Sequence, residues 1–354
     1  MNYAIVFRLL GYVMLIEGAL LLLPAAASWI YGEWFVLGVF LITAAVSAAI
    51  GYALRGIKPK SKVFYMREGF AATAESWITI SIMGAVPFVL TGCIPNPVDA
   101  MFETVSGFTT TGASILPAVE GLPNGILFWR SFTHWIGGMG VLVFLLSLLP
   151  LTGGSHVNLM KAESPGPQVD KLVPKVQSTA KILYGIYFAL TVLEVVFLLL
   201  GGMPLFESML TAFGTAGTGG GIKVSRLLIL GKTLRKELKQ ALHPQVVAPV
   251  RMDGKLLNHE TIRTTNVFVA AYIFIFAASF FLISLNGFDM VTNFTAVAAT
   301  LNNIGPGLAQ VGPMMNFGSF TNPAKLVMIF DMLAGRLEIF PMLVLFLPDT
   351  WRRF

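Results

Sequence analysis

The sequence predicts an all-α polytopic membrane protein, built from repeated units of a membrane span, a short half-helix and a polar turn. Hydrophobic residues make up 55% of the 354 residues and charged residues only 12%, about half the charged fraction of a soluble domain. Apolar runs of about 20 residues recur along the chain, and each is long enough to cross a bilayer. Three connections between these runs share one plan. The composition excludes a soluble enzyme, a disordered tail and a fibrous protein.

Seven segments are predicted as membrane spans. The first carries Glu17 and is too long for the apolar part of a signal peptide, so we expect it to be retained as a span. The single cysteine, Cys93, excludes an intramolecular disulfide. The predicted spans are 3–30, 34–54, 69–92, 125–150, 181–202, 266–287 and 323–348.

The distribution of Lys and Arg predicts which connections face the cytoplasm. The chain has 24 Lys and Arg against 18 Asp and Glu, a net charge of +6. The connections 92–124, 203–222 and 288–322 contain no Lys or Arg, and we expect them to be external. The positive charge therefore reflects membrane orientation, and no nucleic-acid partner is expected. Basic residues gather instead in 55–67, 151–181, 223–263 and the C-terminus, which are expected to be cytoplasmic.

The three external connections repeat one pattern. Each has an acidic residue near the start of a short apolar segment, followed by a turn rich in Thr, Gly or Asn. The first acidic positions are Asp99 and Glu103, the second is Glu207 and the third is Asp289. The turns that follow are 109–114, 214–220 and 302–307.

These segments are too short to span, which favours re-entrant loops. A polar turn at membrane depth leaves backbone groups unpaired unless it lines a water-filled cavity. Several such turns around one axis can offer rings of carbonyl oxygens that replace the hydration shell of a cation. Glycine suits such turns because it adopts positive φ readily. Ordinary external loops with a glycine turn are the alternative, and three matching copies on one side disfavour it.

Five motifs together resemble the Trk/Ktr/HKT superfamily of potassium transporters, and within it the TrkH-like membrane subunits. The resemblance covers nearly the whole chain and implies two N-terminal helices followed by four K⁺-channel-like membrane–pore–membrane repeats around one pore. Each repeat would contribute one filter loop with a central glycine. The motifs are Asp99 to Ser114, Gly137-Gly138-Met139-Gly140, Gly219 to Arg226, Leu301 to Gly307 and Gly335-Arg336-Leu337-Glu338.

The resemblance also implies site residues, partners and location. Arg336 and the glycines 219–221 would gate the pore, and K⁺ would be the transported ion with no cofactor. The family implies a homodimer in the bacterial inner membrane, gated by a cytosolic TrkA-like nucleotide-binding subunit, and a transporter rather than an enzyme. The filter residues implied are Thr110, Thr111, Gly112, Thr215, Ala216, Gly217, Asn303, Ile304 and Gly305, and the gating glycines are Gly219, Gly220 and Gly221.

The chain departs from the family pattern because it has three filter loops instead of four. The span at 181–202 leads outward, yet Lys223 and Arg226 belong to a basic cytoplasmic stretch, and only the weak apolar run 227–230 lies among these charges. A return helix is missing, so we predict an internal deletion between two similar Thr-Gly-Gly stretches. A pore with three of four walls makes conduction by this chain doubtful.

The predicted organisation follows from these assignments. It comprises two N-terminal transmembrane helices (1–66), a first membrane–pore–membrane repeat (67–150), a cytoplasmic linker with a partial second repeat (151–221), a remnant of the third repeat's last helix with a basic cytoplasmic segment (222–264), and the last repeat with the C-terminus (265–354).

Four alternatives remain open at the level of the sequence. The chain could be a non-conducting assembly or regulatory subunit. Ser131 and His134, neighbours on one helix, could belong to an intramembrane hydrolase, although a helix–helix hydrogen bond is favoured. Arg336 could pair structurally with Asp331 or Glu338. The basic segment 232–239 is expected to meet anionic lipid headgroups, with docking of a cytosolic subunit as the alternative.

Overall fold

The computed structural model describes residues 1–57, 65–140, 176–215, 220–246, 248–252 and 255–351. Helices dominate these residues, together with one two-stranded antiparallel hairpin, β1 (Arg251–Met252) and β2 (Lys255–Leu256). The helices are α1 (Tyr3–Leu20), α2 (Leu22–Ile30), α3 (Trp34–Arg55), α4 (Met66–Leu90), α5 (Pro97–Phe108), α6 (Asn124–Met139), α9 (Val176–Leu200), α10 (Leu205–Thr215), α11 (Val224–Leu242), α12 (His259–Ser284), α13 (Met290–Leu301), α14 (Asn322–Arg336), α15 (Phe340–Phe346) and α16 (Pro348–Trp351), with a 3₁₀ turn at Ala309–Val311.

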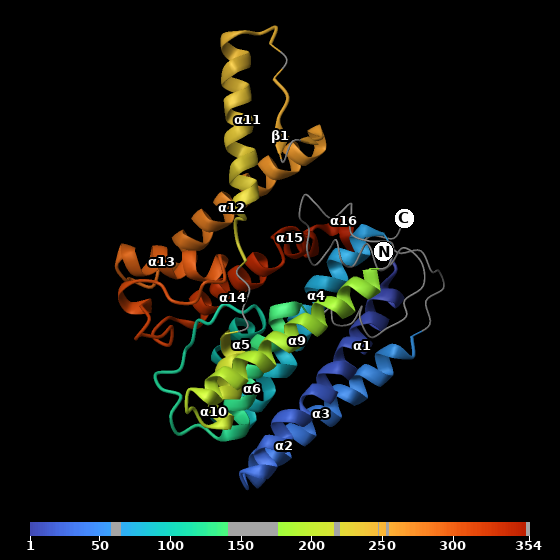
Figure 1. Cartoon of the computed structure of the whole chain (residues 1–354), viewed down its shortest axis with the longest axis vertical. Helices are drawn as coiled ribbons and strands as arrows, with labels where there is room; N and C mark the ends of the chain where they lie inside the picture. Colours follow the sequence, from blue (N-terminus) through green and yellow to red (C-terminus); the bar gives the residue numbers. More distant parts are fainter. Residues whose placement is uncertain (58–64, 141–175, 216–219, 247, 253–254, 352–354) are drawn as a thin grey trace.

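The N-terminal helices form an antiparallel hairpin along one side of the molecule (Figure 1). The expected span 3–30 is divided into α1 and α2 at Leu21. α1 and α3 cross where Gly11 faces Gly51, and a Cβ at Gly11 would lie 2.8 Å from the Gly51 carbonyl oxygen. Small residues at such a crossing let two backbones approach closely within a membrane.

The first repeat consists of α4, α5 and α6. The half-helix α5 packs against both α4 and α6, and α2 packs against α6. Glu33, just before α3, caps the start of α6 by accepting hydrogen bonds from the backbone N–H groups of Asn124 (2.6 Å) and Gly125 (3.0 Å). The Trp129 indole donates to the Gly84 carbonyl oxygen at 2.9 Å. The N-terminal hairpin therefore holds this repeat in place.

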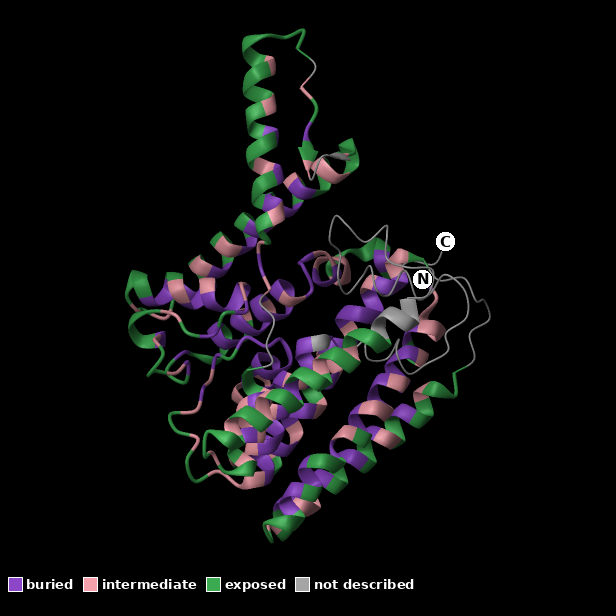
Figure 2. Ribbon diagram, viewed as in Figure 1, coloured by how far each residue is buried: buried purple, intermediate pink, exposed green. Residues whose placement is uncertain are grey.

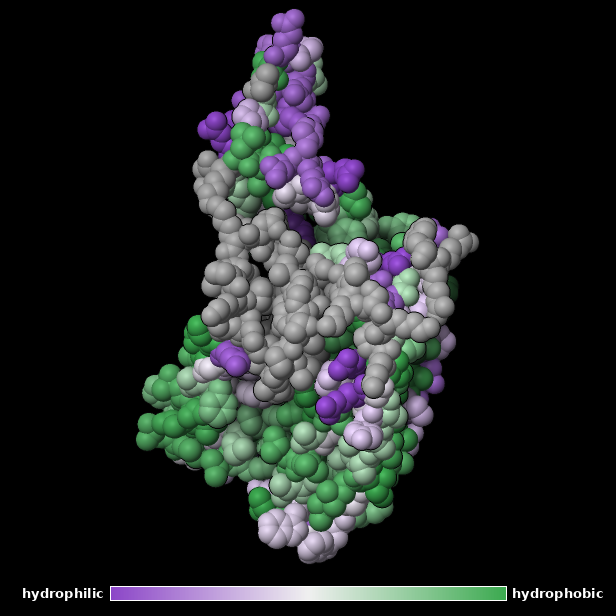
Figure 3. Space-filling model, turned by 90° about the vertical axis from the view of Figure 1, so that its right-hand side faces the viewer, coloured by the Kyte–Doolittle hydropathy of each residue, from purple (hydrophilic) through white to green (hydrophobic). Residues whose placement is uncertain are grey.

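The middle of the chain is less compact. α10 packs against α6 and α9, while most of the described surface of α9 is exposed and apolar. The weak run 227–230 lies within α11, a 19-residue helix that packs on α12 and projects from the body of the molecule (Figure 1). Figure 2 shows α11 mostly exposed, and Figure 3 shows hydrophilic residues gathered at this end above a hydrophobic body.

The last repeat consists of α12, α13, α14 and α15. The expected span 323–348 is broken, because Glu338 and Ile339 adopt positive φ (55° and 68°) between α14 and α15. Pro341 opens α15, where its missing N–H costs nothing.

Among the described residues, five helical segments are long and apolar enough to cross a membrane: Tyr3–Ile30, Trp34–Arg55, Met66–Leu90, Lys181–Leu200 and His259–Ser284. The predicted span 125–150 is described only to Gly140.

The two ends of the chain lie together. The Tyr3 hydroxyl donates to the Trp351 carbonyl oxygen, and Arg67 donates to the Asp349 carbonyl oxygen at 3.4 Å. The start of α1 and the end of α16 therefore lie at the same end of the molecule (Figure 1).

Candidate cation pathway

Two of the predicted filter loops have the same backbone geometry. Thr110 and Gly112 have φ of 57° and 79°, and Asn303 and Gly305 have φ of 53° and 93°. The N–H groups of Thr110 and Thr111 bond to the carbonyls of Gly107 and Ser106, closing the end of α5 in a Schellman pattern. The corresponding N–H groups after α13 bond in the same way, Asn303 to Thr300 and Ile304 to Ala299. The first and last loops are thus structural equivalents, offset by 193 residues, as Thr110 and Asn303 show.

These two loops are in direct contact. The Asn303 side-chain amide donates to the Thr111 hydroxyl at 2.8 Å and to the Met332 carbonyl oxygen at 2.9 Å. A Cβ at Gly305 would lie 2.5 Å from the Thr111 carbonyl oxygen, so only glycine fits there. Thr111 and Asn303 are almost fully buried, at 2% and 3% exposure. Loops from two distant parts of the chain are therefore packed directly against each other.

The C-terminal ends of the two half-helices pack directly against glycines of the return helices. A Cβ at Gly137 in α6 would lie 1.8 Å from the Phe108 carbonyl oxygen, and one at Gly335 in α14 would lie 2.1 Å from the Leu301 carbonyl oxygen. Three residues after each of these glycines the backbone turns to positive φ, at Gly140 (83°) and Glu338 (55°). Both return helices therefore end just below their loop.

Arg336 lies at these helix breaks. Its guanidinium donates to the carbonyl oxygens of Gly137 and Gly138, and its centre lies 5.6 Å from the Trp77 ring centroid. The carboxylates proposed as its alternative partners make other contacts. Asp331 accepts a hydrogen bond from Ser279 at 2.7 Å, and Glu338 pairs with Lys223 and Arg226. Arg336 thus connects the last return helix to the end of the first.

The glycine segment predicted to gate the pore lies against the last loop. The Gly220 N–H donates to the Asn302 carbonyl oxygen at 3.1 Å, and the Gly221 N–H donates to the Gly335 carbonyl oxygen at 3.4 Å. A Cβ at Gly220 would lie 2.1 Å from the Asn303 side-chain oxygen. Arg226 stacks on the Phe268 ring at 3.7 Å and pairs with Glu338, which holds the segment in place.

The second loop is only partly described. Thr215 ends α10, is exposed, and donates its hydroxyl to Glu194 at 2.7 Å. The predicted residues Ala216, Gly217 and Gly219 lie outside the described residues.

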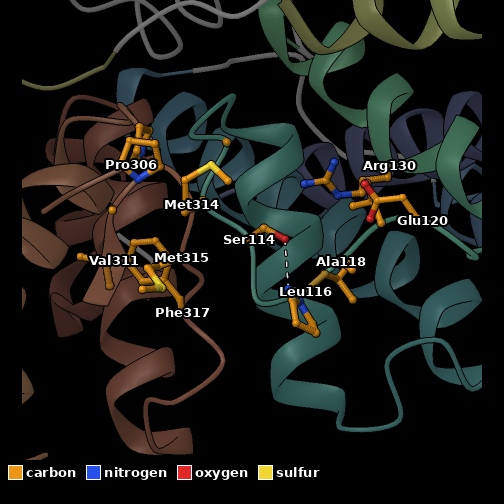
Figure 4. Close-up of a pocket in the computed structure, with 17 residues that line it drawn as sticks. Ser114, Leu116, Ala118, Glu120, Arg130, Pro306, Val311, Met314, Met315 and Phe317 are labelled. Atoms are coloured by element: carbon orange, nitrogen blue, oxygen red, sulfur yellow. Dashed lines mark hydrogen bonds between the residues drawn. The ribbon is translucent and has the colours of Figure 1, made fainter. Parts of the chain in front are cut away.

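A cavity of about 420 Å³ lies against the two described loops, on the side that the sequence predicts to be external. Gly112 and Ser114 line it from the first repeat, and Gly305 and Phe317 from the last (Figure 4). The Phe317 N–H donates to the Ser114 carbonyl oxygen at 2.8 Å, which joins the two walls.

Two acidic residues of α5 form buried or half-buried ion pairs with partners that the sequence pattern does not predict. Asp99 accepts from the buried Lys325 ammonium at 2.6 Å, and Glu103 accepts from Arg130 at 2.6 Å. The repeated acidic position had drawn attention to both carboxylates, but their partners lie on other helices and no local spacing identifies them. In the last repeat, Asp289 caps α13 by accepting from the Thr292 N–H at 3.0 Å.

His134, which the hydrolase alternative requires, is hydrogen-bonded within its own helix at a helix–helix contact. The His134 ring lies 3.1 Å from the Arg130 carbonyl oxygen of its own helix, and the neighbouring Thr133 hydroxyl donates to the same oxygen at 2.7 Å. α6 packs here against α5, whose Gly107 faces Thr133.

A model of the TrkH family, described as a cation transport protein, matches residues 37–213 and 203–352. The Trk system potassium uptake protein TrkH of Salmonella typhimurium is 27% identical over 489 residues, covering 99% of this chain and 100% of that protein. The Trk system potassium uptake protein TrkG of Escherichia coli K12 is 26% identical over 482 residues, with 98% of each covered. The crystal structure of the potassium transporter TrkH from Vibrio parahaemolyticus has the same fold, with a TM-score of 0.83, 24% identity and coverage of 99% of this chain and 100% of that one.

The alignments are longer than this chain, which is relevant to the missing return helix. The Salmonella alignment runs over 489 residues, whereas this chain contributes at most its 354, so well over a hundred residues of the relative have no counterpart here. The two matches to the family model overlap at 203–213, which includes most of α10 and lies just before the predicted junction.

Proposed function

Because the chain belongs to the TrkH family of cation transport proteins, a family of transporters rather than of enzymes, we propose that it is a membrane subunit for potassium uptake across the bacterial inner membrane. K⁺ is the cargo of this process rather than a cofactor. The observation that carries the proposal is the pair of matched loops, in which the sequence-distant Thr110–Gly112 and Asn303–Gly305 share one backbone geometry and touch.

In this proposal the backbone oxygens of Thr110, Thr111, Asn303 and Ile304 take the place of water around a dehydrated K⁺ ion. The left-handed residues turn successive carbonyls away from the helical direction, and the seating on Gly137 and Gly335 fixes the depth of each loop. The second loop, 215–217, would supply a further sector. The relatives are potassium uptake proteins, which supports potassium transport by this chain, and the filter is our extension of that assignment.

We propose that Arg336 and the segment 219–221 form the gate. A half-buried positive charge below the loops opposes the passage of a cation, and Arg336 is held there by two carbonyl oxygens of α6. In a version of the chain that carries the missing stretch of a relative, Arg336→Ala is expected to raise passive Rb⁺ flux into vesicles severalfold, while Arg235→Ala on α11 serves as a charge-matched control. Unchanged or lower flux in Arg336→Ala, at equal protein level, would contradict this role.

The partners belong to the proposal as well. The family resemblance supports a homodimer that is gated by a cytosolic TrkA-like nucleotide-binding subunit. The exposed, basic helix α11 offers a cytoplasmic surface for such a partner or for anionic lipid headgroups.

The missing stretch favours a second candidate function, a non-conducting assembly or regulatory subunit. Well over a hundred residues of the relatives lack a counterpart, so one sector of the pore would be absent from this chain.

Uptake in a K⁺-requiring strain separates the two functions. The chain as it stands and a version carrying the missing stretch of a relative are expressed side by side. Uptake by the restored version is expected, and failure of that version to support growth at low K⁺ would count against the potassium assignment. Co-purification of the short chain with an intact relative, without flux of its own, would favour the assembly function.

A further inference from the structure

A buried carboxylate lies directly behind the outer cavity. Glu103 of α5 is 3% exposed, and its two oxygens accept hydrogen bonds from three groups. The Ser114 hydroxyl lies 3.1 Å from both oxygens, the Ile115 N–H donates at 3.0 Å, and the Arg130 Nε donates at 2.6 Å. Glu103 thus joins the half-helix, the segment that leaves the first loop, and the return helix α6.

The segment held by Glu103 forms a wall of the cavity. Ser114 and Leu116 both line it, and the Ser114 hydroxyl accepts a hydrogen bond from the Leu116 N–H at 3.1 Å. The Ser114 carbonyl oxygen in turn accepts from the Phe317 N–H at 2.8 Å, on the opposite wall (Figure 4). Contacts of one carboxylate therefore extend to both sides of the cavity.

The last repeat supports its loop differently. In the register that aligns Gly112 with Gly305, the counterpart of Glu103 is Ala296. There the outgoing segment is held by hydroxyls, since the Leu308 N–H donates to Thr295 at 3.0 Å. Hydrogen bonds to an ionised group are roughly twice as strong as those between neutral groups. The first loop alone, of the two that are described, is anchored by a buried charge.

Arg130 completes the arrangement. Its guanidinium lines the cavity beside the first loop, and its charge would repel an approaching cation if it were not compensated. The ion pair also satisfies the buried carboxylate, which would be costly to leave without a counter-charge.

We propose that Glu103 and Arg130 act as a positioning pair for the first filter loop, fixing the outer wall of the cation path and thereby setting the affinity and ion discrimination of uptake. This inference rests on the proposed function. Neither residue is required to touch the ion. Glu103 acts through Ser114 and Ile115, and Arg130 keeps the carboxylate in place while its own charge is neutralised.

The first test compares uptake kinetics in the restored chain. Glu103→Ala is expected to raise the half-saturating K⁺ concentration roughly tenfold, the factor that loss of one hydrogen bond to a charged group represents, and to lower K⁺ preference over Na⁺. Glu103→Gln, which keeps an acceptor oxygen, is expected to show a smaller change, and Glu103→Gln/Arg130→Gln to recover part of what Glu103→Gln loses. The matched control is Glu207→Ala, an exposed acidic residue of the half-helix α10.

The second test needs no transport. In the chain as it stands, with Cys93→Ser, Leu116→Cys reports on the wall through its rate of modification by a membrane-impermeant maleimide. Glu103→Ala is expected to raise this rate severalfold because the segment loses its anchor, whereas Glu207→Ala leaves it unchanged.

The two tests have separate consequences. An unchanged maleimide rate in Glu103→Ala overturns the positioning role. A change in maximal rate alone, with half-saturation and ion preference kept, also overturns it, because that result reports only protein amount. If the restored parent fails to transport K⁺ while the maleimide rate responds as expected, the proposed function fails and the positioning of the wall by Glu103 stands.

Discussion

At the scale of single residues, the loops depend on residues with positive φ, and the sequence predicts this conformation for only some of them. The glycine turns predicted positive φ, and Gly112 and Gly305 adopt it. Thr110 and Asn303 adopt it too, without any glycine signal. Asn tolerates the left-handed region, so Asn303 could have been suspected, but Thr is β-branched and Thr110 could not. At Thr110, the hydrogen bonds that close the end of α5 and the buried contacts override the preference of Thr for negative φ.

Gly112 offers a controlled test of the filter. It has φ of 79° and Gly287, outside the loops, has φ of 78°, and neither would bring a Cβ within 4 Å of another atom. Replacement of either by Ala is expected to cost about 1–2 kcal/mol, the price of a left-handed Ala residue. Only Gly112→Ala is expected to change ion preference, measured as Rb⁺ uptake in competition with Na⁺. Equal effects of the two replacements on ion preference would show that the conformation at Gly112 has no special role.

The cap that Asp289 forms on α13 is expected to make the stability of the first turn of this helix depend on pH. The hydroxyl and backbone N–H of Thr292 stabilise its carboxylate and hold its pKa below the ordinary value. A lowered pKa in the folded state means that the stabilisation is present above the ordinary pKa of about 4 and is lost as the pH falls through the folded-state pKa. Acidification below about pH 4 is therefore expected to speed amide exchange in the first turn of α13.

A neutral cap at the same position provides the control for this measurement. Asn96 shows that an amide can fill this role, since it caps α5 by accepting from the Val98 N–H at 2.9 Å, and an amide does not titrate. Asp289→Asn should therefore let the first turn of α13 keep its protection over the same pH range. Equal loss of protection in the parent and in Asp289→Asn would indicate general unfolding and not titration of Asp289.

At the scale of elements, the helix breaks decide how the gate segment is attached. Glu338 lies at the break after α14 with its side chain 6% exposed, and it pairs with Arg226, which is 5% exposed. Removing one member of a buried pair leaves an uncompensated charge. Glu338→Ala is expected to cost about 3–5 kcal/mol and to raise hydrogen exchange at the start of α11.

The exposed pair of Lys236 and Glu237 on the same helix is the matched control, because Glu237 is 62% exposed. Glu237→Ala is expected to change stability by less than about 1 kcal/mol. Retention of normal exchange in α11 of Glu338→Ala would mean that the segment is attached by other contacts.

The hydropathy of the chain predicts most helices but not where they stop. The predicted spans ending at 30, 54 and 92 end within two residues of α2, α3 and α4, because length and apolar content are properties of each segment alone. The break at 337–339 is different, since Leu337 and Ile339 are as apolar as the residues around them. This break depends on the close packing of Gly335 against the Leu301 carbonyl and on the ion pairs of Glu338. Both are contacts between elements, which hydropathy does not report.

At the scale of the whole molecule, the sequence predicted the matched repeats but not how the repeats meet. The motifs predicted matched loops at 109–114 and 302–307, and these loops are in contact. Lys325 follows its partner Asp99 by 226 residues, and no pattern in either segment indicates the pair. Long-range pairings of this kind are set by the packing of α14 on α5 and become visible only in three dimensions.

The contacts between the first and last repeats also set the order in which the chain can mature. Asp99 and Ser114 leave the ribosome well before Lys325 and Phe317, which complete their surroundings. At roughly 5–20 residues per second, the 226 residues between Asp99 and Lys325 take roughly 10 to 45 s to translate. During that interval the nascent first loop carries polar groups without their final partners, and the insertion machinery or lipid headgroups must shelter them. The surroundings of the first loop are therefore completed only after the last repeat has been made, however early its first segment enters the bilayer.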